Sequence, residues 1–347
     1  MKYIITICIV LMFFSCHPSK IEVIPVNLTQ NLKGEVLSEI DVQLPYVIKV
    51  VDTFLFICNQ RGKFFFEVYS TNSYRKISEF GTEGRGPNEF VRPIFTGQTE
   101  YDDNNELRVH VYDLARRRVV FINDRGVLNN TDSHQTYLIP TLESFVTRVY
   151  YLDQNYLVSL IAEETGRGSI YNIVHREESQ IGYKPKFGFN YMKSDASKLY
   201  KSTTLCVNQS KEEIASALYY TGQIDFFDFS GEYLRSIYYT DHSGLKECYL
   251  KNGFKVMEQE QYIYSLERNG EQLFGMNVNN KLKDLVNGTP NNTIIHRFDW
   301  DGTKQDQYIL DRQVDSFTYD PSENCFYCVF QGIEKSSIVK FQIEHEK

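Results

Sequence analysis

The chain has 347 residues, including 25 Tyr and 24 Phe but only one Trp and nine Pro, and its net charge is −8. This mildly acidic balance argues against nucleic acid as a partner, because phosphates attract clustered Lys and Arg. Aromatic residues favour half-buried pleated surfaces. Runs with helical period are nearly absent, apart from a short helix expected over residues 280–286, so the sequence predicts an all-β fold.

The N-terminus begins with one basic residue, Lys2, followed by an apolar run over residues 3–14 and then Ser15 and Cys16. This order is typical of a secretion signal, and the run is shorter than the roughly 20 residues of a membrane-spanning helix. A small residue directly before a cysteine resembles a bacterial lipoprotein signal, which implies cleavage before Cys16 and its acylation. A plain signal peptide or a buried N-terminal helix are the alternatives.

The segment after Cys16 is polar and has no clear period. We therefore expect a lipidated cysteine and tether over residues 16–32, with the acyl chains holding the protein at a membrane. No acidic residue follows Cys16 directly. By resemblance to proteobacterial lipoproteins, this favours the outer membrane, with a periplasmic or surface-exposed body.

A strand-and-turn pattern recurs along the body. An aromatic strand ends in Asn or Asp, and Gly follows three positions later, in residues 121–126, 226–231 and 297–302. Asx side chains cap hairpin turns, and Gly accepts the positive φ that other residues resist. A degenerate copy covers residues 69–73, and a weaker one covers residues 175–178.

The spacing of these turns is close to regular. Ser73 and Gly126 are 53 residues apart, Gly126 and Gly231 are 105 apart, and Gly231 and Gly302 are 71 apart. The longer interval indicates an insertion, which we place within residues 269–292. Repeats of about 50 residues, each too small to bury its own apolar face, indicate a β-propeller.

Six four-stranded blades fit this period, with seven as the alternative. The last predicted strand, over residues 337–343, has no following partner, and residues 34–42 could supply the missing outer strand and close the ring. The expected organisation is a signal peptide over residues 1–15, the lipidated tether, and a single propeller domain over residues 33–347.

A glycine-rich stretch after the first hairpin contains Gly81, Gly84 and Gly86, followed by Pro87 and then Glu89. In this position it resembles the TolB-like, six-bladed propeller lipoproteins of Bacteroidetes, which are similar to NHL-like propellers. The resemblance implies an exported six-bladed propeller and no particular ligand or reaction.

The candidates for ligand contact lie in this stretch and in the basic run over residues 116–118, which we expect to form a turn between strands. Arg85 and Glu89 either pair to pin a connection between blades or contact a ligand. Arg116 and Arg117, close after Asp113, either form a solvated turn or hold a carboxylate or sulfated sugar through bidentate pairing.

No catalytic residues can be assigned. The histidines lack zinc spacing, and no cofactor or metal is predicted. Asp299 and Asp301 could hold Ca²⁺, although turn capping accounts better for both. Five cysteines remain in the body, and the C-x-x-C pair Cys325 and Cys328 lies on a predicted strand, where positions i and i+3 face opposite ways. We therefore expect buried thiols.

The favoured function is a membrane-anchored binding or scaffold module whose partner is a protein or glycan of the cell envelope. A hydrolase or lactonase with an active site at the channel mouth is the alternative, and a structural subunit of an envelope complex is a third hypothesis. Propellers host all of these, so the fold cannot decide among them.

Overall fold

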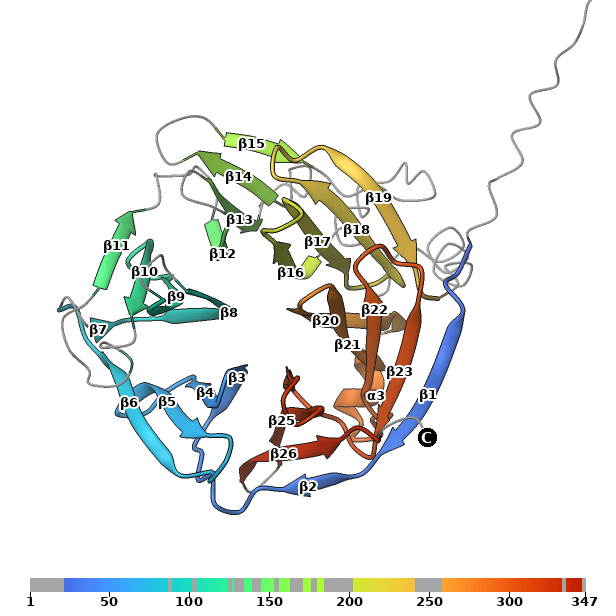
Figure 1. Ribbon diagram of the computed structural model, residues 1–347, viewed down its shortest axis with the longest axis horizontal. Coiled ribbons are helices and arrows are strands. Elements are labelled where there is room, and N and C mark those ends of the chain that lie inside the picture. Colours follow the sequence, from blue (N-terminus) through green and yellow to red (C-terminus); the bar gives the residue numbers. More distant parts are fainter. Residues whose placement is uncertain are drawn as a thin grey trace, which may run out of the picture.

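The computed structural model describes residues 22–86, 89–101, 105–123, 127, 134–138, 145–152, 156–162, 171–175, 180–183, 202–240, 258–332 and 335–344. The predicted signal peptide and Cys16 lie outside these ranges. The described strands form six sheets arranged around a central axis (Figure 1). The predicted six-bladed β-propeller is therefore confirmed, and the seven-bladed alternative is wrong.

The first three blades follow one another along the chain, each running from an innermost to an outermost strand. Their strands are, for blade 1, β3 (Pro45–Val51), β4 (Phe54–Asn59), β5 (Phe64–Ser70), β6 (Lys76–Glu83) and the short β7 (Glu89–Phe90); for blade 2, β8 (Pro93–Tyr101), β9 (Leu107–Asp113), β10 (Arg118–Asn123) and β11 (His134–Leu138); and for blade 3, β12 (Phe145–Tyr151), β13 (Tyr156–Ala162), β14 (Tyr171–His175) and β15 (Gln180–Tyr183).

The last three blades complete the ring, and two of them take an outer strand from the N-terminal segment. Their strands are, for blade 4, β16 (Ser202–Asn208), β17 (Glu213–Leu218), β18 (Gln223–Asp228) and β19 (Tyr233–Tyr238); for blade 5, β20 (Glu260–Asn269), β21 (Gln272–Lys281), β22 (Ile294–Asp299), β23 (Gln305–Leu310) and β1 (Val26–Leu32); and for blade 6, β24 (Ser316–Asp320), β25 (Cys325–Gln331), β26 (Ser336–Gln342) and β2 (Gly34–Val36).

The N-terminal segment closes the ring in two places. Strand β2 pairs antiparallel with β26, with Gly34 opposite Phe341, so the predicted closure of the last blade is confirmed. Strand β1 also pairs, in parallel with β23, with Leu32 opposite Leu310. The predicted tether over residues 16–32 is therefore too long, because residues 26–32 belong to blade 5 and their backbone completes the hydrogen bonding of its outer edge.

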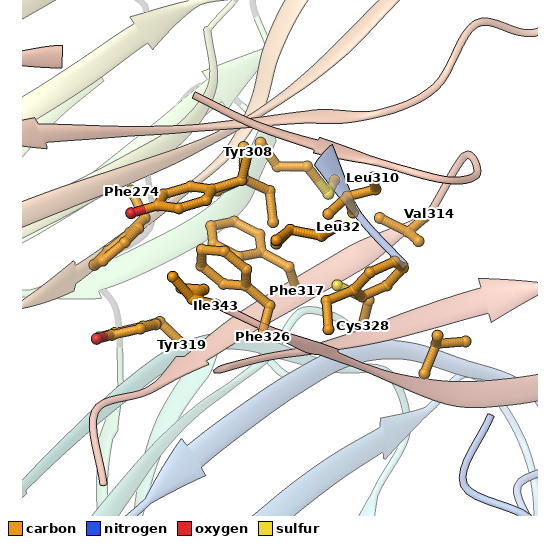
Figure 2. Packing of buried hydrophobic residues seen from close by; sticks show 14 residues of the cluster. Leu32, Phe274, Tyr308, Leu310, Val314, Phe317, Tyr319, Phe326, Cys328 and Ile343 are labelled. Atoms are coloured by element: carbon orange, nitrogen blue, oxygen red, sulfur yellow. The ribbon is translucent and has the colours of Figure 1, made fainter. Parts of the chain in front are cut away.

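The junction of blades 5 and 6 shows how the core is filled. Figure 2 shows Leu32 of β1 packed among Tyr308, Leu310 and Phe326, all of which are buried. Phe326 stands edge-on to Tyr308, with ring centroids 5.3 Å apart. Burying Leu32 stabilises the closure by roughly 1.5–3 kcal/mol, so the N-terminal strand adds apolar packing as well as hydrogen bonds.

The hairpin turns that carried the repeat have the predicted chemistry. Gly231 and Gly302 adopt φ values of 87° and 75°, which glycine reaches without the strain of a Cβ. Asp228 Oδ1 accepts the backbone N–H of Ser230 at 2.9 Å, and Asp299 Oδ1 accepts that of Lys304 at 2.8 Å. The third turn, at residues 124–126, and the weak copy at 176–178 lie outside the described residues.

Two smaller predictions are also confirmed in the second half of the chain. A short helix, α3 (Leu282–Val286), follows β21 and accounts for part of the predicted insertion. Cys325 and Cys328 are free, buried thiols on β25 and point into two different core clusters, as expected for positions i and i+3 of a strand. Among the described residues, no helix is long and apolar enough to cross a bilayer.

Side chains link the blades around the channel. In each of six hydrogen bonds, a side chain of one blade accepts a backbone N–H from the innermost strand of the next blade. We call these the cross-blade ring: Phe95 to Tyr46 (3.4 Å), Tyr151 to Gln98 (2.8 Å), Leu205 to Tyr150 (3.1 Å), Ile263 to Tyr239 (3.2 Å), Tyr319 to Glu267 (3.4 Å) and Val50 to Thr318 (3.0 Å). The inner strand edges, which lack a neighbouring strand, thereby gain hydrogen-bond partners.

Candidate functional site

The glycine-rich connection from blade 1 to blade 2 meets the turn between β9 and β10. Glu89, through its backbone oxygen, and the side chains of Asp113, Arg116 and Arg118 form this contact, and we call these four residues the junction cluster. Arg116 Nη1 donates to the Gly86 oxygen at 2.8 Å. The cluster lies where β7 and β8 join the two blades (Figure 1).

The junction cluster is built around a buried carboxylate. Asp113 is fully buried and accepts the backbone N–H groups of Val91 (3.3 Å) and Arg92 (3.2 Å). Arg118 Nη2 donates to the Glu89 backbone carbonyl oxygen at 2.7 Å, and its Nε lies 3.8 Å from Asp113 Oδ2. Burial, with repulsion from Arg116, lowers the pKa of Arg118. These contacts hold the connection between the blades in place.

The expected pair between Arg85 and Glu89 is not formed. Glu89 Oε2 accepts the Gly86 N–H at 2.6 Å, because the chain turns back on itself at this point. A Cβ at Gly84 would lie 2.0 Å from Glu89 Oε2, so a larger residue there would displace the Glu89 carboxylate from this bond. Arg85 is exposed and makes no ion pair with any residue that the structure describes.

The structure thus divides the predicted ligand-binding residues into two groups. Glu89, Asp113 and Arg116 come together and support the loop. Arg85 and Arg117 point to solvent, with Arg117 in a turn at φ 51°. Their role toward a ligand stays a prediction.

The central cavity, which no sequence motif indicates, has a volume of about 370 Å³. Its wall is built from the innermost strand of every blade, and the charged side chains on it are Lys49, Arg148, Glu267, Arg268 and Asp315. These residues are spread over more than 260 positions of sequence. They share no sequence motif: Lys49 lies in the largely apolar β3, Glu267 and Arg268 lie at the polar end of β20, and Asp315 precedes β24.

An ion pair crosses the cavity from blade 1 to blade 5. Lys49 Nζ lies 2.6 Å from Glu267 Oε1, and the two side chains are only 16% and 9% exposed. The same carboxylate oxygen accepts the Thr318 hydroxyl at 2.9 Å. Glu267 therefore joins three blades at one point.

Two further side chains on the cavity wall, His110 and Tyr264, could contact a ligand. His110 is buried between the rings of Phe121 and Tyr151, and burial lowers its pKa against the opposing effect of Glu100, whose Oε1 lies 3.3 Å from its Nε2. Tyr264 is 39% exposed on the cavity wall, and its ring lies 6.2 Å from that of Tyr219. Among the described residues, no three His, Cys, Asp or Glu side chains gather in a way that could hold a metal ion.

The ring of six antiparallel blades, closed by the N-terminal segment, defines the chain as a six-bladed β-propeller. The model of the TolB-like 6-blade propeller-like family matches residues 27–165, so the predicted resemblance to TolB-like propellers is confirmed. None of the curated proteins matches the chain.

Solved structures show the same fold at low identity. A protein of Bacteroides fragilis classed as exported has a TM-score of 0.53 and 13% identity, over 91% of this chain and 100% of that one. A member of the DUF4221 family from Bacteroides vulgatus gives 0.54 and 9%, over 91% and 98%. A luciferin-regenerating enzyme gives 0.51 and 9%, over 90% and 95%. At these identities the likeness is one of fold.

Proposed function

We propose that the chain is a membrane-anchored propeller that acts as a binding or scaffold module for a protein or glycan partner at the cell envelope. Its N-terminal layout, with Cys16 after an apolar run, supports export and lipidation. The exported Bacteroides fragilis protein of the same fold is consistent with this placement. The outer membrane remains the favoured location, because no acidic residue follows Cys16.

The central cavity is the observation that carries the binding role. Its volume of about 370 Å³ lies within the roughly 300–1,000 Å³ typical of ligand sites. The cross-blade ring holds its wall in one arrangement, so little ordering is needed when a ligand enters.

The charges on the wall favour a glycan that carries carboxylates. The wall carries three cationic side chains, Lys49, Arg148 and Arg268, against the two carboxylates of Glu267 and Asp315, so cationic groups are in excess there in a chain whose net charge is −8. Guanidinium groups pair with carboxylates through two parallel hydrogen bonds. The exposed ring of Tyr264 offers an apolar face on which a sugar can stack.

A thermal-shift screen of a chain that begins at Glu22 tests the binding role. Carboxylated oligosaccharides should raise its melting temperature more than neutral ones, because a ligand that binds only the folded state stabilises it by mass action. Arg268→Gln and Tyr264→Ala should each weaken binding by about tenfold, or ~1.4 kcal/mol. Arg75→Gln, on the exposed surface away from the cavity, should leave it unchanged.

The other outcomes separate the remaining hypotheses. If oligosaccharides have no effect but a photo-crosslinker at Tyr264 captures one envelope protein from intact cells, the partner is a protein. If an oligosaccharide or lactone is consumed, the hydrolase or lactonase alternative gains support. Cys16→Ala should release the protein from carbonate-washed membranes, and retention there would contradict the lipid anchor.

A further inference from the structure

The chain enters the propeller at one defined point on the outer rim. The Ile24 N–H donates to the Tyr238 oxygen at the end of β19, at 2.8 Å. The Ile24 side chain is buried in the cluster that contains Phe298 and Trp300. Strand β1 then begins at Val26, beside Gln305 of β23. The entry point therefore lies where the rim of blade 4 meets that of blade 5 (Figure 1).

The sequence leaves little length between this entry and the predicted lipid. Eight residue steps separate Cys16 from Ile24, and an extended chain covers at most ~3.6 Å per residue, or ~29 Å in all. A compact chain of this size has a radius of gyration of about 20 Å and is about 50 Å across. The entry point can therefore reach the membrane surface much more easily than the opposite rim.

The opposite rim carries the junction cluster. In a ring of six, blade 4 faces blade 1 and blade 5 faces blade 2, so the junction of blades 1 and 2 lies across the ring from the entry (Figure 1). Arg85 and Arg117 are exposed there. At the entry itself, Val23 and Val26 are 37% and 43% exposed, and exposed apolar side chains of this kind gain free energy at a lipid interface.

We infer that the rim of blades 4 and 5 lies against the lipid headgroups, and that the junction of blades 1 and 2 is held at the far side of the ring, facing away from the membrane. This orientation rests on the proposed lipid anchor. It leaves both mouths of the central cavity open to the side, and it presents Arg85 and Arg117 to partners beyond the membrane surface.

Fluorescence quenching by headgroup-labelled lipids tests the orientation. The lipidated chain, with Cys248 replaced by Ser, receives one exposed cysteine at either Lys304, beside the start of β1, or Arg92, at the junction. The two variants each remove one positive charge, so they control for each other. The described native cysteines are buried and should not react with the dye.

In vesicles, the Lys304 label should lose at least about twofold more fluorescence than the Arg92 label, because only the first lies near the short tether. Equal quenching of the two labels would show a ring lying flat and would overturn the orientation while leaving the anchor intact. A chain that does not float with vesicles would overturn the anchor and the orientation together. A Gly-Ser insertion after Lys20 should reduce the quenching at Lys304.

Discussion

The side-chain amide of Gln98 forms both backbone hydrogen bonds of Tyr151. Its Nε2 donates to the Tyr151 oxygen and its Oε1 accepts the Tyr151 N–H, each at 2.8 Å. One residue of blade 2 thus takes the place of a neighbouring strand along the inner edge of blade 3. The contact is one link of the cross-blade ring that surrounds the cavity.

Replacing this amide should weaken the interface of blades 2 and 3. Gln98→Ala removes both bonds and leaves two backbone groups unpaired, which should lower the free energy of unfolding by about 2 kcal/mol. Urea denaturation measures the change. Gln209→Ala is the matched control, because Gln209 also lines the cavity but has no side-chain hydrogen bond among the described residues. A similar loss in both variants would contradict the role of the Gln98 contact.

The ion pair across the cavity should show strong coupling. Lys49→Met leaves the nearly buried Glu267 carboxylate without its cation and should cost about 3 kcal/mol. The double variant Lys49→Met with Glu267→Gln should cost less than the sum of the single changes, because it leaves no unpaired charge. Lys335→Met removes the exposed pair with Asp41 and should have no measurable effect on the free energy of unfolding. If the costs of the two single changes add up to that of the double variant, Lys49 and Glu267 do not stabilise each other.

His296 should make the fold sensitive to acid. Asn277 and Gln305 side chains lie at hydrogen-bond distance from its ring nitrogens, and complete burial lowers its pKa to about 3. The unfolded chain, with a histidine pKa near 6.5, binds more protons between these two values. Stability is therefore fully present above about pH 6.5 and falls by up to ~1.4 kcal/mol per pH unit toward pH 3.

Urea unfolding between pH 7 and pH 4 measures this loss. His296→Gln keeps a hydrogen-bonding side chain but does not titrate, so its stability should depend less on pH than that of the unchanged chain. Parallel pH profiles for the two proteins would mean that His296 does not contribute.

Removing β1 should destabilise the propeller. If residues 16–32 were only a tether, as the sequence predicted, their removal would leave the stability of the propeller unchanged. A chain that begins at Lys33 lacks Ile24 and Leu32, both of which are buried, and exposes the outer edge of β23. It should melt at a lower temperature and associate through that edge. A chain that begins at Glu22 should behave as a stable monomer. Equal melting temperatures would show that β1 is dispensable.

The features of the fold that could be predicted from the sequence are those set by residues close to one another in the chain. The turns at Gly231 and Gly302 need an Asx cap and a positive φ, and each feature is visible within six residues. The closing strand at Gly34 was predicted because the last strand lacked a neighbour. The number of blades follows from the spacing of the hairpin turns along the sequence, since each blade repeats the same hairpins.

Strand β1 was missed because its sequence, VNLTQNL, is polar and only Leu32 is buried. Its pairing with β23 is made by backbone groups, which every residue has, so no side-chain pattern predicts it. The contacts at the two candidate sites could not be predicted from the sequence for a related reason. Arg118 was noted only as part of a basic run, and its contact with Asp113 and Glu89 depends on how two blades meet. Lys49 and Glu267 meet only when the ring is closed.

Closure by the first strands also sets the order in which the molecule can form. The Gly34 N–H is bonded to the Asp311 carboxylate, 277 residues away, and β2 pairs with the last strand of the chain. Contacts of such separation form late, because the loop between them must close first. Blades 1 to 4 use no strand beyond Tyr238, so they can assemble before the C-terminal part of the chain joins them. Strand β1 needs β23 and strand β2 needs β26, so both N-terminal strands stay unpaired, and open to proteolysis, until these C-terminal strands have formed.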